Sequence, residues 1–92
     1  MTYEIKYTSR FVKDLEQAKK RGKKLDKLFA VIEKLASGEP LEPKNRVHML
    51  VGEYSGYWEC HIEPDWLLVY EKFEDVLVLS MYRTGSHSDL FK

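Results

Sequence analysis

The sequence predicts an α+β domain with an N-terminal strand, an antiparallel two-helix hairpin and a mainly antiparallel meander of three strands. Residues 3–7 alternate apolar and charged side chains, which is the period of a strand. Residues 10–37 repeat apolar side chains at helical spacing, interrupted at Gly22. Residues 57–83 hold three apolar runs separated by turn residues. Such a meander buries the apolar stripes of the helices on one face of its sheet.

The hairpin is predicted from local end signals. Thr8 or Ser9 can cap a helix that starts at Arg10, and Gly22 suits its left-handed end. A second helix is predicted for residues 23–37. Because the connection is short, we expect the two helices to be antiparallel.

The three strands of the meander are predicted at residues 57–62, 67–73 and 76–83. Pro64 fixes its own φ and Asp65 can hydrogen-bond its own backbone, so they predict the turn between the first two strands. The third strand follows a tight turn and should lie centrally, because it offers apolar side chains to both faces. Residues 48–51 resemble the start of a further strand, and residues 84–92 are predicted to be a polar tail with a glycine bend.

Length and composition limit the architecture. The 92 residues, 43% of them hydrophobic, fit one domain (residues 1–92) with a single core. The one cysteine excludes an internal disulfide, and the N-terminus lacks the pattern of a signal peptide. The apolar runs are too short to span a bilayer. We therefore expect a soluble cytoplasmic protein with no membrane partner.

Charge is balanced overall but unevenly distributed. The formal net charge of zero argues against strong nonspecific binding to nucleic acid. Residues 1–46 carry twelve Lys and Arg against seven Asp and Glu, whereas residues 47–92 carry three against eight. Six cations gather between the helices, namely Lys19, Lys20, Arg21, Lys23, Lys24 and Lys27. They form either a solvated face or, chiefly through Lys19, Lys20 and Lys23, a contact with phosphates.

Three histidines are the main candidates for chemistry. His48, His61 and His87 each stand at the edge of a predicted element, outside any apolar stripe, which favours exposed imidazoles. His61 and Asp65 should face each other across the turn, where an imidazole beside a carboxylate can exchange a proton near neutral pH. The alternative is that this pair only satisfies backbone groups of the loop.

Metal and covalent chemistry are not predicted. The histidines and Asp65 are a possible zinc ligand set, but their spacing matches no metal motif. Cys60 lies in a predicted strand and is expected to be a buried apolar side chain. No glycine-rich phosphate loop is present. We therefore expect a site without a metal or cofactor.

The remaining residue types suit RNA cleavage. The proton carriers are His48, His61, Asp65 and His87, and Arg83 supplies positive charge. In RNA cleavage the ribose 2′-oxygen attacks the adjacent phosphorus, a base takes its proton, an acid protonates the leaving 5′-oxygen, and a cation stabilises the phosphorane. The nucleophile thus belongs to the substrate. Trp66 and Phe91 can stack on bases or pack in the core, where Phe91 would pin the C-terminal tail to the sheet.

The chain resembles the YafQ branch of the RelE/ParE toxins along essentially its whole length. The resemblance lies in His48-x-Leu50-x-Gly52, Gly56-Tyr57, the stretch from Glu59 to Leu68, and the stretch from Arg83 to Phe91. It implies a RelE-like, microbial-ribonuclease-like fold and the toxin of a type II toxin–antitoxin pair. Such a toxin is an endoribonuclease that cuts mRNA on the 70S ribosome, in contact with 16S rRNA, and is silenced by a cognate antitoxin.

The resemblance also suggests which residues act. The family's acid–base and RNA-contacting positions fall on His48, His61, Asp65, Arg83, His87 and Phe91, with Trp66 beside them, and His87 is the first catalytic candidate. The chain departs from the family at Trp58, where an arginine is common, and in its neutral charge. Two alternatives are a ParE-like toxin that binds a protein target such as gyrase, without enzymatic activity, and a degenerate partner that only binds an antitoxin.

Overall fold

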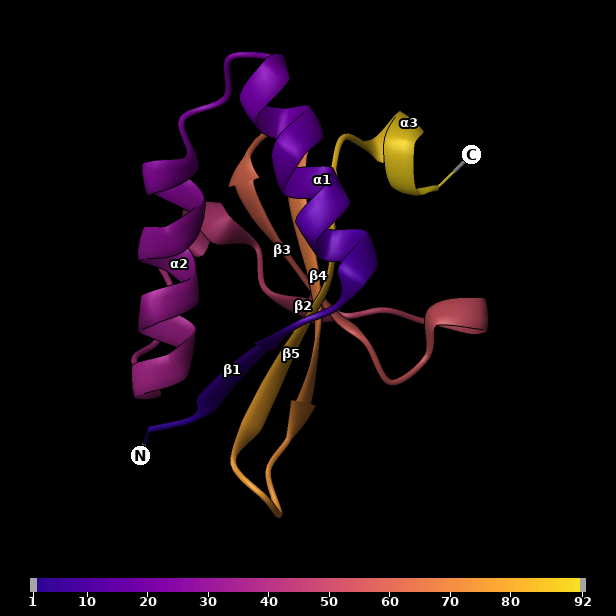
Figure 1. The fold of residues 1–92 in the computed structure, drawn as a ribbon. Coiled ribbons are helices and arrows are strands. Elements are labelled where there is room, and N and C mark those ends of the chain that lie inside the picture. The colour runs from indigo at the N-terminus through magenta and orange to yellow at the C-terminus, as the bar shows by residue number, and fades with distance from the viewer. Residues whose placement is uncertain (1, 92) are drawn as a thin grey trace.

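A mixed five-stranded sheet lies at the centre of the computed structural model, which describes residues 2–91. Its strands are β1 (Glu4–Tyr7), β2 (His48–Met49), β3 (Trp58–Glu63), β4 (Trp66–Phe73) and β5 (Val78–Gly85). The spatial order is β1-β5-β4-β3-β2 (Figure 1). β1 is parallel to β5, and the other neighbouring pairs are antiparallel. The α+β architecture is confirmed, and β5 lies inside the sheet between β1 and β4.

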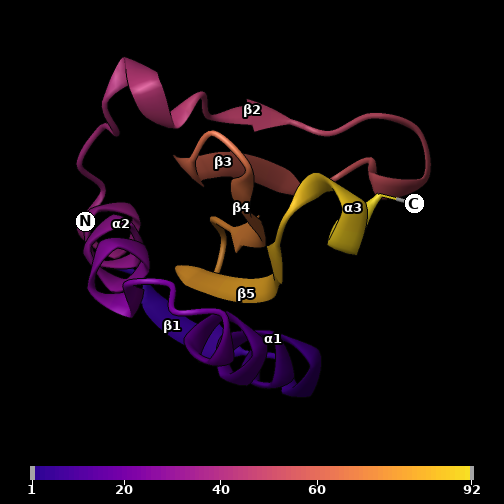
Figure 2. The ribbon, with the colours of Figure 1, turned by 90° about the horizontal axis from the view of Figure 1, so that it is seen from above.

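The two-helix hairpin covers one face of this sheet, as predicted, and a short C-terminal helix that was not predicted lies on the other face. The hairpin consists of α1 (Ser9–Lys20) and α2 (Leu25–Ser37), and a short α3 (His87–Leu90) follows β5. Figure 2 shows α2 and α3 on opposite sides of β3, β4 and β5. Two 3-10 turns, η1 (Pro43–Asn45) and η2 (Gly52–Tyr54), flank β2. Among residues 2–91, no helix has the length and apolar character needed to cross a membrane.

Each face of the sheet has its own apolar cluster. The larger cluster joins the hairpin to the sheet through Phe11, Leu28, Ile32, Cys60, Trp66, Leu68, Tyr70, Leu79 and Met81, with Ala18 and Ala36. The smaller one contains Leu67, Val69 and Leu90, bordered by Leu50, Tyr57, Tyr82 and Phe91. Because successive side chains of a strand point to opposite faces, β4 supplies both clusters. This explains its uninterrupted apolar run over residues 66–70.

The helix ends agree closely with the end signals. Thr8 caps α1, because its Oγ1 accepts a hydrogen bond from the backbone N–H of Phe11 at 3.0 Å. The same hydroxyl donates to the carbonyl of Tyr82 at 2.9 Å, which ties the cap to β5. Gly22 follows α1 with φ +78°, a conformation that suits glycine.

The largest differences from the predicted elements occur near the C-terminus. β5 begins at Val78, two residues later than predicted, because Leu77 adopts a left-handed φ of +53° and extends the turn. The strand then continues to Gly85, and residues 87–90 form α3 instead of a polar tail. A capping box between Ser86 and Asp89 stabilises this helix. Lys92, the last residue of the predicted tail, lies outside the described residues.

Candidate active site

The first residue of α3, His87, is held by the turn between β3 and β4. Asp65 in that turn accepts hydrogen bonds through Oδ1 from the backbone N–H of His87 at 2.9 Å and from its ring Nδ1 at 2.6 Å. These hydrogen bonds, the backbone one first, lower the pKa of Asp65. Both side chains are more than half exposed. Because Nδ1 is occupied, Nε2 is the ring atom of His87 that can exchange a proton with a substrate.

A second imidazole lies beside this pair. The rings of His61 and His87 have centroids 5.8 Å apart and an interplanar angle of 60°. His61 is only 9% exposed, and its carbonyl accepts a hydrogen bond from the side chain of Asn45 at 2.8 Å. The fold thus brings together two histidines from distant parts of the sequence, one exposed and one largely buried.

A buried carboxylate, that of Glu59, lies between His48 and His61. Glu59 is 5% exposed, and its Oε1 lies 3.3 Å from Nε2 of His48 and 3.7 Å from Nε2 of His61. The pairing of β2 with β3 places His48 opposite Glu59. The resulting polar row runs from His48 through Glu59, His61 and His87 to Asp65. Carboxylates and imidazoles placed this close together can hold and move protons.

Glu59 was not predicted from the sequence as a candidate site residue. The signal that was available is its position two residues before His61 in a predicted strand, which puts both side chains on one face of the sheet. Its cross-strand neighbour His48 could not be predicted, because the register of β2 depends on the loop before it.

The expected pairing of His61 with Asp65 across the turn is wrong. The register of β3 and β4 shifts between His61 and Glu63, and α3 brings His87 over the turn to take Asp65 as its partner. The carboxylate that lies near His61 is instead Glu59. The expectation that all three imidazoles are exposed also fails for His61, which lies opposite Leu67 in the sheet.

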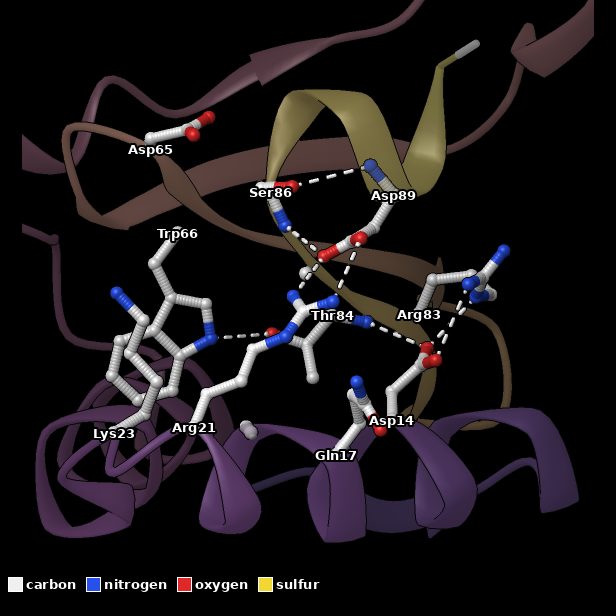
Figure 3. A pocket seen from close by; sticks show the side chains of 12 residues that line it. Asp14, Gln17, Arg21, Lys23, Asp65, Trp66, Arg83, Thr84, Ser86 and Asp89 are labelled. Carbon is white, nitrogen blue, oxygen red and sulfur yellow. Dashed lines mark hydrogen bonds and ion pairs between the residues drawn. The ribbon is translucent and has the colours of Figure 1, made fainter.

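Arg83 is engaged by the first helix. Its Nε and Nη2 donate to the carboxylate of Asp14 at 2.7 and 3.2 Å, and the backbone N–H of Thr84 donates to the same group at 3.1 Å. Figure 3 shows Arg83 and Asp65 on opposite sides of a pocket. The structure therefore does not bring the Arg83 guanidinium to the pair formed by His87 and Asp65.

The two aromatic candidates serve packing. Trp66 is 1% exposed, and its Nε1 donates to Oγ1 of Thr84 at 3.0 Å, so it is not available to stack on a base. Phe91 is partly buried against the smaller cluster. Its ring meets that of Tyr54 edge-on, with centroids 5.3 Å apart. Phe91 thus fixes the C-terminal segment to the sheet, which was the second of the two interpretations offered by the sequence.

Part of the cation run between α1 and α2 is neutralised by acidic groups. Arg21 pairs with Asp89 at 2.6 Å, and Lys23 and Lys27 pair with Glu63 at 3.4 and 2.9 Å. The hydrogen bond from Lys27 is the main cause of the lowered pKa of Glu63. Lys19 and Lys20 are exposed in the last turn of α1. The run thus both ties the hairpin to the rest of the molecule and presents free positive charge.

A pocket of about 460 Å³ lies next to the polar row, between α1, β5 and the start of α3 (Figure 3). Its walls include Asp14 and Arg21 from the hairpin side, and Asp65 and Asp89 from the other. Within the described part of the chain, no group of three or more His, Cys, Asp and Glu side chains is arranged to hold a metal ion.

The fold is that of a class of bacterial toxins that function in type II toxin–antitoxin systems. The family model of the YafQ toxin, described as a bacterial toxin of a type II toxin–antitoxin system, matches residues 3–92. The chain belongs to the YafQ family. This confirms the resemblance carried by its motifs.

Individual relatives are similar over nearly their full length. The mRNA interferase toxin YafQ of Escherichia coli K12 is 39% identical over 89 residues, which are 96% of this chain and 95% of the relative. The crystal structure of YafQ from E. coli BL21(DE3) has a TM-score of 0.91 at 34% identity, covering 98% of this chain and 99% of that one. A chain of the E. coli DinJ-YafQ toxin–antitoxin complex gives 0.90 at 34% identity, with both chains fully covered. A metal-bound toxin from Helicobacter pylori gives 0.91 at 41% identity, covering 99% and 100%.

Proposed function

We propose that this protein is an endoribonuclease that cleaves mRNA and thereby inhibits translation, as the toxin of a type II toxin–antitoxin pair. The observation that carries the proposal is the exposed His87, whose Nδ1 is held by Asp65 and whose ring lies 5.8 Å from that of His61. The name mRNA interferase toxin borne by the E. coli relative supports it. The complex of E. coli YafQ with DinJ supports a cognate antitoxin as the protein partner.

The proposed reaction uses the ribose of the substrate as nucleophile. The 2′-oxygen forms a bond to phosphorus and the bond from phosphorus to the 5′-oxygen breaks, leaving a 2′,3′-cyclic phosphate and a 5′-hydroxyl. One proton leaves the 2′-hydroxyl and another reaches the 5′-oxygen. We assign one of these transfers to Nε2 of His87 and the other to the neighbouring His61. Neither step requires a metal, so the products should form in EDTA.

The ribosome completes the substrate-binding site in this proposal. Arg83 and Arg21, the arginines in the pocket wall, are both engaged by carboxylates, and the chain has no net charge. The protein alone is therefore weakly equipped to hold a phosphate backbone. We place mRNA on the 70S ribosome as the substrate, with Lys19 and Lys20 facing phosphates of 16S rRNA.

Replacing His87 with alanine tests the catalytic assignment. We expect cleavage of ribosome-bound mRNA to fall by about 10²–10⁴-fold, the usual contribution of a general acid or base. Far-UV circular dichroism and antitoxin binding should remain native, because His87 is exposed. Ser88→Ala, also exposed on α3, is the matched control and should cleave normally. Native rates from His87→Ala, or products that end in a 3′-hydroxyl, would overturn the proposal.

A further inference from the structure

The carboxylate of Asp89 both caps α3 and links this helix to α1. Asp89 Oδ2 accepts a hydrogen bond from the backbone N–H of Ser86 at 2.9 Å, and the Asp89 N–H donates to Ser86 Oγ at 3.2 Å. The same carboxylate accepts hydrogen bonds from both Nη atoms of Arg21, at 2.6 and 3.2 Å. Arg21 is the C-cap residue of α1. Figure 3 shows Arg21 reaching across the pocket to meet Asp89.

The glycine before α3 leaves room for the contact between Asp89 and Arg21. Gly85 is the last residue of β5, and a Cβ added there would lie 3.0 Å from both Cβ and Oδ2 of Asp89. A separation of 3.0 Å is tighter than nine in ten real Cβ contacts, so Asp89 would have to move by a few tenths of an ångström. Glycine at this position therefore leaves the space that Asp89 occupies when it bonds to Ser86 and Arg21.

A helix as short as α3 needs such an anchor. It contains four residues, and a single turn does not hold itself together, because helix nucleation costs more than one hydrogen bond returns. Leu90 at its end is buried in the smaller cluster, but His87 at its start is exposed and rests on Asp65. Among the hydrogen bonds and ion pairs of residues 2–91, the contact of Asp89 with Arg21 joins the helix to α1.

We propose that Arg21, Gly85 and Asp89 are positioning residues that hold His87 against Asp65 and beside His61. The proposal rests on the function proposed above, in which His87 transfers a proton. It differs from a direct role of Arg21 in binding RNA phosphate, since both Nη atoms of Arg21 already bond to Asp89. Arg21, with help from the Ser86 N–H, holds the pKa of Asp89 well below its usual range, so the contact persists at neutral pH.

A double-mutant cycle distinguishes a positioning role of Arg21 and Asp89 from direct binding of RNA phosphate by Arg21. In Arg21→Met and Asp89→Asn, we expect kcat for ribosome-bound mRNA to fall about tenfold while KM stays unchanged, because a misplaced catalytic group costs rate and not binding. The double variant should lose no more than the worse single variant, since both changes break one contact. Arg10→Met and Asp26→Asn, exposed on α1 and α2, are the matched controls and should keep the native kcat. A rise in KM alone, or losses that multiply, would overturn the proposal.

Gly85→Ala tests the same contact from the backbone side. The added methyl group requires Asp89 to shift by a few tenths of an ångström, which strains its contact with Arg21. We therefore expect kcat to fall, and no further loss when Arg21→Met is added. A Gly85→Ala variant with native kcat contradicts the proposal, as does one whose loss multiplies with that of Arg21→Met.

A measurement without RNA keeps this proposal separate from the proposed function. The N–H groups of Leu90 and Phe91 donate to the carbonyls of Ser86 and His87, so their hydrogen exchange reports on α3. Exchange should be at least about tenfold faster in Arg21→Met than in Arg10→Met, with the amide of Leu68 in β4 unchanged. Unchanged exchange at Leu90 and Phe91 would overturn the positioning role. A native protein that cleaves no RNA but shows faster exchange in Arg21→Met would contradict the proposed function alone.

Discussion

Asp65 determines which ring nitrogen of His87 is engaged within the protein. Its Oδ1 accepts hydrogen bonds from both the backbone N–H and Nδ1 of His87, which fixes the ring orientation and leaves Nε2 for exchange with other groups. An imidazole held in this way keeps one tautomer. The catalytic role proposed for His87 therefore depends on a neighbour that does not need to touch the RNA.

Asp65→Asn should lower cleavage strongly while leaving the fold intact. An amide can donate as well as accept, so it no longer selects the tautomer of His87 with Nδ1 protonated. We expect about a 100-fold loss in kcat, measured with ribosome-bound mRNA. Asp75→Asn, exposed in the turn before β5, should cleave normally. Native activity in Asp65→Asn would show that this carboxylate does not orient the catalytic imidazole.

Glu59 should be required for stability as well as for cleavage, because its side chain is buried. Glu59→Ala removes the carboxylate that His48 and His61 share and leaves the largely buried ring of His61 without it, which costs free energy. We expect cleavage to fall at least about tenfold and the free energy of unfolding to fall by about 1–3 kcal/mol. Urea titration and the cleavage assay measure the two effects. Glu53→Ala, at an exposed glutamate in η2, is the control, and equal behaviour of the two variants would contradict a shared role for Glu59.

At the scale of elements, local signals predicted most of the architecture. The hairpin, the turn at Pro64 and the strands β3 and β4 follow from caps, turn residues and periodicity. The helix α3 was missed, although Ser86 and Asp89 have the spacing of a capping box, because a four-residue helix has too few residues to show a period. The late start of β5 could not be predicted either, since nothing local marks Leu77 for a left-handed conformation.

The residues that form the candidate site were predicted better than the contacts between them. His48, His61, His87 and Asp65 do lie together, as expected, but the partners differ. The contact of Asp65 with His87 spans 22 residues and that of Arg83 with Asp14 spans 69. Such pairs depend on the register of the sheet and on the path of α3, which local patterns do not contain.

The cap of α1 gives a prediction at this scale. Thr8→Ala removes both the acceptor for Phe11 N–H and the donor to the Tyr82 carbonyl. We expect the free energy of unfolding to fall by about 1 kcal/mol or somewhat more, measured by urea denaturation. Thr8→Ser keeps both hydrogen bonds and should stay close to native stability. An equal loss in both variants would show that the methyl group, and not the hydroxyl, stabilises this end of the helix.

At the scale of the whole molecule, several carboxylates make stability depend on pH. The pKa values of Glu63, Asp65 and Asp89 are all lowered by hydrogen bonds or ion pairs in the folded protein. A group with a lowered folded pKa contributes stability above its unfolded pKa, near 4, and loses it as pH falls toward the folded value.

The free energy of unfolding should therefore decline as pH drops below about 5. Asp89→Asn should show a shallower decline, because it lacks the group that Arg21 keeps ionised. Urea titrations at pH 7 and pH 3 measure the difference between the two proteins. A decline of the same steepness in both would mean that Asp89 does not contribute to the acid sensitivity.

The proposed function requires a protein with no net charge to approach the ribosome, which is a polyanion. The end of α1 and the helix α3 lie at the same end of the molecule (Figure 1), so the exposed Lys19 and Lys20 are near the end that carries His87. Charge on that end can steer the protein to phosphates even when the total charge is zero. Each phosphate contact contributes roughly 0.7–0.9 to the salt dependence of log K.

Lys19→Glu combined with Lys20→Glu should therefore weaken ribosome binding and flatten its salt dependence by about one to two units of slope. Lys6→Glu combined with Lys34→Glu changes the net charge equally, but it does so in β1 and near the far end of α2. If the position of the charge matters, the second pair keeps the native slope and loses affinity only slightly. If the two pairs lose affinity and slope alike, total charge governs the encounter and the cationic end of α1 has no special role.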